Sequence, residues 1–302
     1  MVSLAVRLRA LLLLVVLALF SGCSAIRLTY NQAPTLTWWW LNDYLDFNET
    51  QSVTARQGLK DWFAWHRRHE LPVYAALLGE IREGLKGEVS GSTVCAWRTA
   101  LTDQLANAFE AGVPPLSRLA GTLEPAQLAR LEDRFKQSNK DLQEEYGSGT
   151  LEARTKRSRK RTERFLKRVY GRLDPAQREY VLAHTAETSF DPVRWLDERA
   201  HRQAFVLSEL REVMAIKGQG ATVARQARAE KMLRAYAALY AESPRAGYQA
   251  YRERLIQRNC ALFAEVHAMA SPRQRAHADK TLRAWERDLR MLASQSATAV
   301  AD

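Results

Sequence analysis

Two short segments of this chain carry the side chains most able to ligate a metal. His66, His69 and Glu70 fall within five residues, at spacings that share one face of a helix. Two imidazoles and one carboxylate can bind zinc. However, their order fits neither H-E-x-x-H nor H-x-x-E-H, and the two arginines between the histidines oppose a cation. We therefore expect Trp65 and His66 to pack in the core with Arg67, Arg68 and Glu70 outside, and a metal-dependent hydrolase is the least favoured hypothesis.

The second segment is an E-x-x-H motif formed by Glu198 and His201. Di-iron helical bundles need two such motifs and two further glutamates, and the sequence contains no second E-x-x-H. The sequence also lacks G-x-S-x-G, a P-loop and a dinucleotide-binding fingerprint. We therefore predict a non-enzymatic protein with no catalytic residues, no metal and no cofactor.

A basic segment is the strongest charge feature of the chain. Residues 154–172 contain ten arginines and lysines against one acid, Glu163, and their apolar positions repeat at helical spacing. Such a helix indicates contact with an anionic ligand. The alternative is a solvated face that nearby acids, such as Glu144, Glu145 and Glu152, partly neutralise. The predicted anion-binding residues are Arg157, Lys160, Arg161, Arg164, Lys167 and Arg168.

The first 22 residues predict a secretory signal peptide. Arg7 and Arg9 precede an apolar run from Ala10 to Phe20, and the small pair Ser21-Gly22 follows. The alternative is a membrane-spanning helix, but the apolar run is about half of the roughly 20 residues that a span needs. Removal of Arg7 and Arg9 with this segment lowers the formal charge from +11 to +9.

Small residues directly before Cys23 resemble the lipobox of bacterial lipoproteins, although Phe20 stands where lipoboxes usually have Leu. The resemblance implies cleavage before Cys23 and acylation of that residue. Ser24, rather than Asp, follows the cysteine, which in Gram-negative lipoproteins implies the periplasmic face of the outer membrane. We therefore expect the membrane as a partner through the Cys23 anchor, together with an anionic envelope ligand or a protein partner, and no nucleic acid.

Two cysteines remain if Cys23 carries lipid. An oxidising periplasm favours a disulfide between Cys95 and Cys260, which would tie the first third of the chain to the last. Two buried free thiols are the alternative. No C-x-x-C motif is present, so a thioredoxin-like site is excluded.

Composition and periodicity predict an all-α fold. The chain is rich in good helix formers, and apolar residues recur at helical spacing with no clear period-two alternation. Three related phrases, LEPAQL at 123–128, LDPAQR at 173–178 and MASPRQR at 269–275, place a proline directly after a capping residue and predict helix starts. Pro72 is expected to end or kink the helix that starts after Asn48. We predict an elongated antiparallel bundle of about 8–10 helices.

The expected organisation has four parts. A signal peptide at 1–22 precedes a lipid-anchored tether at 23–34, a single helical domain at 35–294 and a disordered tail at 295–302. The run Trp38-Trp39-Trp40 lies at the start of the domain. Three consecutive residues of a helix point in different directions, so we expect at most two of them to face the core. Contact with the membrane surface is the alternative, because tryptophan favours bilayer interfaces.

Several motifs together resemble an uncharacterised family of Gram-negative helical lipoproteins, a domain of unknown function. They are Gly22-Cys23-Ser24, Arg27-Leu28-x-Tyr30-Asn31, Trp40-Leu41-x-x-Tyr44-Leu45-Asp46 and Trp65-His66-x-x-x-Glu70-Leu71-Pro72-x-Tyr74, with later likeness at Leu173-x-Pro175-x-Gln177, Gln274-Arg275 and Asp288-Leu289-Arg290. The resemblance covers most of the mature chain. It implies a location and a helical fold but no activity and no site residues.

Two phrases are also similar to the L-T-x-x-Q motif of Spy-type periplasmic chaperones. Leu123-Glu124-x-x-Gln127 and Leu173-Asp174-x-x-Gln177 lack the threonine, and this chain is much longer. The leading expectation is therefore a non-enzymatic lipoprotein that binds or scaffolds an envelope partner, and a Spy-like chaperone is the alternative.

Overall fold

A computed structural model describes residues 25–187 and 190–298, so the predicted signal peptide and Cys23 lie outside the described residues. The described chain is helical, and no strand occurs in it. Its elements are α2 (Ala25–Leu45), α3 (Glu49–Gly84), α4 (Gly91–Ala120), α5 (Pro125–Leu142), the short π-helix η1 (Gln143–Gly147), α6 (Leu151–Tyr170), α7 (Pro175–Glu187), α8 (Pro192–Ala215), α9 (Ala221–Ala241), α10 (Ala246–Ala268) and α11 (Pro272–Thr298). The prediction of an all-α fold with about 8–10 helices is confirmed.

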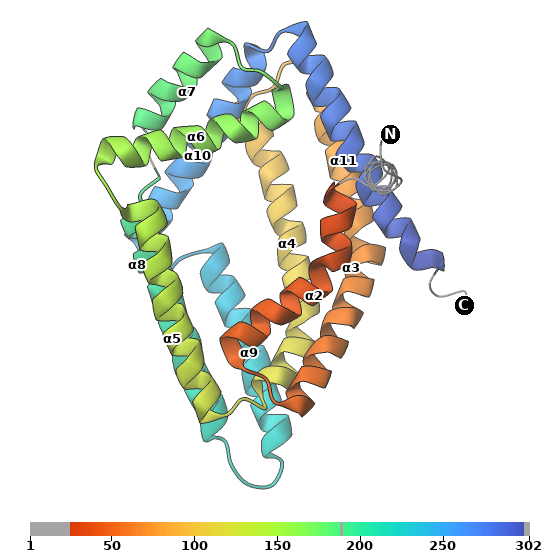
Figure 1. The fold of residues 1–302 in the computed structure, drawn as a ribbon, viewed down its shortest axis with the longest axis vertical. Helices are drawn as coiled ribbons and strands as arrows, with labels where there is room; N and C mark the ends of the chain where they lie inside the picture. Colours follow the sequence, from red (N-terminus) through yellow and green to blue (C-terminus); the bar gives the residue numbers. More distant parts are fainter. Residues whose placement is uncertain (1–24, 188–189, 299–302) are drawn as a thin grey trace, which may run out of the picture.

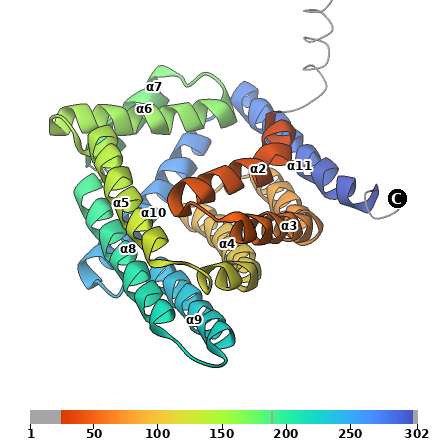
Figure 2. The ribbon, with the colours of Figure 1, turned by 60° about the horizontal axis from the view of Figure 1, so that its bottom comes forward.

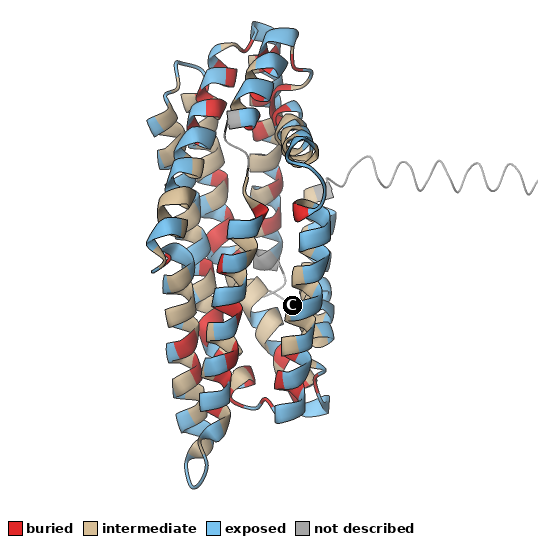
Figure 3. Ribbon diagram, turned by 90° about the vertical axis from the view of Figure 1, so that its left-hand side faces the viewer, coloured by how far each residue is buried: buried red, intermediate tan, exposed pale blue. Residues whose placement is uncertain are grey.

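The helices form an elongated frame. Helices α6 and α7 lie at the top of Figure 1, α5 lies beside α8 at the left, and α2, α3 and α11 lie at the right. Helix α4 packs against α3, α9 and α10 and so joins the sides of the frame, as Figure 2 shows from below. Buried residues are spread along the whole length of the frame in Figure 3 rather than gathered at one end.

The three proline phrases start helices as predicted. Pro125, Pro175 and Pro272 are the first residues of α5, α7 and α11. At this position the missing N–H has no intrahelical partner to lose, and the fixed φ of proline suits the helix. Two residues after each proline, the side-chain oxygen of a glutamine accepts a hydrogen bond from the backbone N–H of the capping residue. The phrase is therefore a capping motif.

These glutamines also join distant helices in pairs. Gln127 of α5 and Gln51 of α3 exchange two amide hydrogen bonds of 2.7 and 3.1 Å, and Gln177 of α7 and Gln274 of α11 exchange two of 2.8 and 3.2 Å. All four side chains are buried. Asn48-x-x-Gln51 is a fourth capping box, at the start of α3, and it has no proline. We call each pair a glutamine clasp.

Several helices are longer than predicted. Helix α2 begins at Ala25, inside the predicted tether, because Arg27 pairs with Asp288 of α11 and Tyr30 contacts α3. At the other end α11 continues to Thr298, so residues 295–298 of the predicted tail are helical. Pro72 does not end α3. The helix continues through this proline to Gly84 and packs along α4 and α11.

Two apolar clusters hold the ends of the frame. At the upper end of Figure 1, buried side chains of α6, α7, α10 and α11 pack together, with Tyr170 and Leu173 among the most buried. At the lower end, α5, α8 and α9 pack around Leu128, Leu210 and Met232. None of the described helices combines the length and apolar character needed to cross a bilayer.

Candidate functional site

The exposed face of α6 carries a stripe of basic side chains. Leu166, Val169 and Tyr170 bury one side of the helix in the upper cluster. The opposite side exposes four basic residues spaced four apart, which we call the α6 stripe: Lys156, Lys160, Arg164 and Arg168. Within the described part of the chain, no acidic side chain pairs with any of them. The α6 stripe is therefore a concentrated and uncompensated positive charge.

The other predicted anion-binding residues have partners within the protein. Arg157 donates to the backbone oxygen of Ser148, and Lys167 lies 3.6 Å from a carboxylate oxygen of Glu163. The guanidinium of Arg161 lies over the ring of Tyr146, 4.8 Å from its centre. Of the six predicted residues, three belong to the stripe: Lys160, Arg164 and Arg168. Lys156, the fourth residue of the stripe, was missed, although its spacing of four from Lys160 is a signal in the sequence.

A large apolar cavity lies beneath α6, between helices α3, α4, α6, α10 and α11. Its volume is about 760 Å³, and Arg98 is the one charged side chain among the residues that line it. Phe165 and Leu101 line the cavity while remaining half exposed, so they mark its opening to solvent. The other lining residues include Leu77, Leu78, Ile81, Trp97, Leu166, Val169, Ile256, Phe263, Leu282, Trp285 and Leu289.

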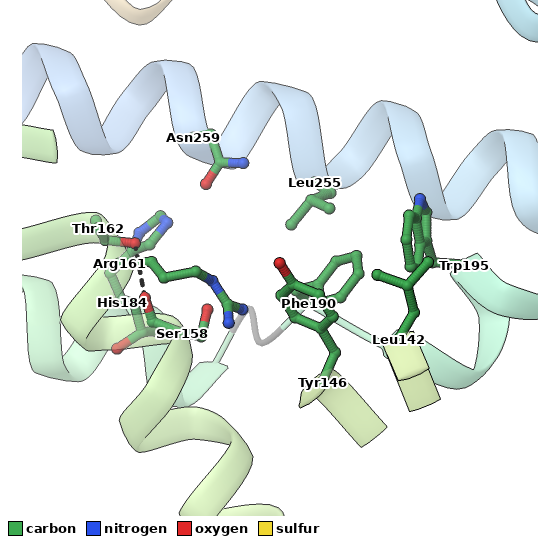
Figure 4. A pocket seen from close by; sticks show the side chains of 11 residues that line it. Leu142, Tyr146, Ser158, Arg161, Thr162, His184, Phe190, Trp195, Leu255 and Asn259 are labelled. Carbon is green, nitrogen blue, oxygen red and sulfur yellow. Dashed lines mark hydrogen bonds between the residues drawn. The ribbon is translucent and has the colours of Figure 1, made fainter. Parts of the chain in front are cut away.

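A second, more polar pocket of about 390 Å³ adjoins this cavity. Thr162 and Asn259 line both spaces, so the two spaces lie next to each other at these side chains. Figure 4 shows Arg161 of α6 reaching between Ser158 and the rings of Tyr146 and Phe190. His184 of α7 and Trp195 of α8 complete the polar pocket, and its lining contains no acidic side chain.

The residues of the candidate metal constellation differ in burial. His66 is buried, and its Nδ1 atom lies 2.8 Å from the hydroxyl oxygen of Tyr30. Glu70 is also buried, whereas His69 is exposed and stacks on Trp65 with ring centres 5.7 Å apart. The prediction that His66 packs in the core is confirmed, whereas Glu70, which was expected to lie outside, is buried. Glu198 is buried and its carboxylate contacts Arg202 and Arg245, while His201 is exposed.

No three His, Cys, Asp or Glu side chains of the described residues lie close enough together to hold a metal.

The two remaining cysteines lie at disulfide distance. Cys95 of α4 and Cys260 of α10 have Cα atoms 5.5 Å apart and are joined through their sulfur atoms. Cys260 is buried and lines the apolar cavity. The pair thus holds together two of the five helices that form the cavity wall.

The three tryptophans of the run Trp38-Trp39-Trp40 point in different directions, as expected for consecutive residues of a helix. Trp38 packs against the cluster of Phe47, Ala55 and Leu119, and the guanidinium of Arg56 lies 3.5 Å from the centre of its ring. Trp39 and Trp40 are 58% and 57% exposed. One of the three residues faces the core and two face outward, within the predicted limit.

The comparisons with known proteins give one match. A family model described as a family of unknown function (DUF6279) matches residues 43–222. No curated protein and no solved structure matches the chain. The matched range covers α3 to α8, including the α6 stripe and both partners of the first glutamine clasp.

Proposed function

The chain belongs to the DUF6279 family, whose function is unknown, and we propose that it is a non-enzymatic lipoprotein of the outer membrane that binds phosphate-bearing envelope lipids through α6. The observation that carries this proposal is the α6 stripe. Its four basic side chains are exposed along one face and have no acidic partner among the described residues. Each basic residue near an anionic lipid surface contributes about 1 kcal/mol to binding.

Lipid attachment at Cys23 is the second part of the proposal. The sequence before Cys23 resembles a lipobox, and α2 begins two residues after it. The exposed positions of α2 between residues 28 and 40 carry no charge and include Leu28, Leu36, Trp39 and Trp40. Because tryptophan favours the bilayer interface, this uncharged face suits a helix held close to a membrane by its neighbouring lipid anchor.

Cell fractionation tests the anchor. After a high-salt wash, a Cys23→Ala variant should leave the outer-membrane fraction and appear as a soluble periplasmic protein, because the leader still directs export, signal peptidase I can cleave it, and no acyl chain holds the product. Persistence of the variant in the outer membrane after that wash would overturn the anchor, because salt releases protein that is held only by the charges of the α6 stripe. Appearance of the unaltered protein in the cytoplasm would overturn the location.

Vesicle sedimentation tests the α6 stripe. The mature chain without an acyl group should bind vesicles that contain phosphatidylglycerol, bind neutral phosphatidylcholine vesicles far more weakly, and dissociate as salt screens the charges. A variant with Lys156, Lys160, Arg164 and Arg168 replaced by Gln should bind about several hundredfold more weakly, since four residues at about 1 kcal/mol each contribute about 4 kcal/mol.

A charge-matched control separates the stripe from net charge. Replacing four scattered exposed residues of α9, α10 and α11, namely Lys231, Arg254, Arg273 and Lys280, by Gln removes the same charge. This control should retain most of the binding. Equal losses in the two variants would show that only overall charge matters and would contradict a site on α6.

A holdase chaperone is the second candidate function. It is favoured by the glutamine clasps, which place the chaperone-like Leu-x-x-x-Gln phrases at the helix junctions, and by a cavity that opens an apolar lining to solvent. Aggregation of a reduced, unfolded client should be suppressed at an equimolar ratio. No suppression at a severalfold excess would exclude this candidate.

A further inference from the structure

The apolar cavity and the polar pocket adjoin in a way that suits one ligand with two chemically different parts. The cavity offers about 760 Å³ lined almost wholly by apolar side chains, and the polar pocket offers about 390 Å³ with Arg161 reaching into it. Small-molecule sites typically enclose about 300–1,000 Å³ and combine an apolar lining with a few polar groups. Both spaces fall within this range.

We propose that the two spaces form a single site for an anionic amphiphile with one acyl chain. The chain would lie in the cavity among α3, α4, α6, α10 and α11, and the carboxylate or phosphate head would lie in the polar pocket against Arg161. This inference is independent of the α6 stripe, whose residues lie on the exposed face of the same helix.

The charge of Arg161 in the polar pocket favours an anionic head group. Arg161 has a cation–π contact with Tyr146 but no ion pair with a carboxylate of the described residues, and the pocket lining includes no Asp or Glu. An anionic head can therefore accept charge-assisted hydrogen bonds from the guanidinium without displacing an internal acid. Ser158, Thr162 and Asn259 add neutral hydrogen-bonding groups at the same place.

The apolar lining of the cavity favours an acyl tail. Side chains from five helices line the cavity, and the half-exposed Phe165 and Leu101 leave its mouth open. An acyl chain entering this space would remove both its own surface and that of the lining from water, which is the main favourable term in binding of apolar groups. A single acyl chain suits one cavity of about 760 Å³, which lies within the size range of small-molecule sites.

Two tryptophans in the cavity wall, Trp97 and Trp285, allow the position of the bound acyl chain to be measured by fluorescence. Stearate that carries a doxyl nitroxide in the middle of its chain should quench the fluorescence of the mature protein, because a nitroxide quenches tryptophan at contact range. A W97F/W285F variant should lose most of this quenching while still binding unlabelled stearate. Unchanged quenching in that variant would place the chain elsewhere and overturn the proposal.

Competition then tests the head group. Unlabelled stearate or stearoyl lysophosphatidic acid should displace the probe about tenfold more effectively than monostearoyl glycerol, which has the same chain and no charge, given the usual strength of a charge-assisted contact. Whichever of the two anions competes better identifies the head as carboxylate or phosphate. Failure of both anions to compete would contradict the site.

Variants of α6 complete the test. Arg161→Gln should remove the preference for the anion, Arg161→Lys should keep most of it, and Arg164→Gln, on the exposed stripe, should leave it unchanged. Thermal unfolding of each variant checks that it is folded. A preference that survives R161Q, or is lost equally in R164Q or in a variant of the other lining cation, Arg98→Gln, would overturn the assignment of the head group to Arg161.

Discussion

His66 is a buried imidazole enclosed by aromatic side chains. Its ring stacks against Tyr30 and lies close to Trp62 and Tyr74, and its Nδ1 atom is hydrogen-bonded to Tyr30. Burial, reinforced by the charge of the Arg67 guanidinium, lowers the pKa of His66 from 6.5 to about 4. The folded protein therefore holds His66 neutral where an unfolded chain would protonate it.

This difference predicts a loss of stability in acid. Above pH 6.5 the imidazole is neutral in both the folded and the unfolded protein, so His66 makes its full contribution to the unfolding free energy. As the pH falls from about 6.5 to about 4, the unfolded chain gains a proton that the folded chain resists, so the contribution is lost. In urea titrations at pH 7.5 and 4.5, the unaltered protein should lose more unfolding free energy between the two pH values than an H66F variant.

The control for this prediction is His201→Gln, which removes an exposed imidazole of α8. It should show the same pH dependence as the unaltered protein. If H66F has that same pH dependence too, the acid sensitivity arises elsewhere and His66 is not held neutral by the fold.

The glutamine clasp between α3 and α5 gives a second prediction at the residue scale. Gln127 accepts from the N–H of Glu124 and donates to backbone oxygens of Leu45 and Asp46 and to Gln51. A Q127A variant leaves several of these buried groups unpaired, and we expect a loss of about 2–3 kcal/mol in unfolding free energy. Urea denaturation measures it.

A double-mutant cycle tests whether the clasp acts as a unit. The Q51A/Q127A variant should lose clearly less than the sum of the two single losses, because each single variant already breaks the shared bonds. The exposed Gln137→Ala variant should change stability by less than about 0.5 kcal/mol. Additive losses for Gln51 and Gln127 would mean that the two amides contribute separately.

Among the elements, α4 and α10 are fixed to each other by Cys95 and Cys260, 165 residues apart in sequence. We expect the variant with both cysteines changed to Ala to lose up to about 5 kcal/mol of unfolding free energy, the chain-entropy value for so long a loop. Calorimetry measures the loss. Mass spectrometry of non-reduced peptides from the native protein should show the two cysteines linked, and free thiols at both would contradict the pairing.

The starts of the helices were more predictable than their ends. Pro125, Pro175 and Pro272 start helices through local chemistry, since the cap, the proline and the glutamine lie within four residues. Pro72 was expected to end or kink a helix. The helix does not end there, because α3 continues through Pro72 and packs along α4 and α11. Residues 25–34 are helical for the same reason, because Arg27 and Tyr30 have partners on distant helices.

At the scale of the whole molecule, the basic helix was evident from the sequence and the cavity was not. The α6 stripe follows from spacing within one segment. The residues that line the cavity, such as Leu78, Val169 and Leu289, have the same helical periodicity as core residues. Only the arrangement of five helices leaves space between them, and no local pattern encodes that space.

Photocrosslinking in intact cells tests the central claim, binding of phosphate-bearing envelope lipid by α6, most directly. A benzophenone amino acid at position 160 on the α6 stripe, or at the exposed position 254 on α10 as a control, would be activated by light in cells grown with radioactive phosphate. We predict radioactive lipid attached to the protein at position 160 and little or none at position 254. No labelled adduct at 160, or equal labelling at both positions, would contradict the account.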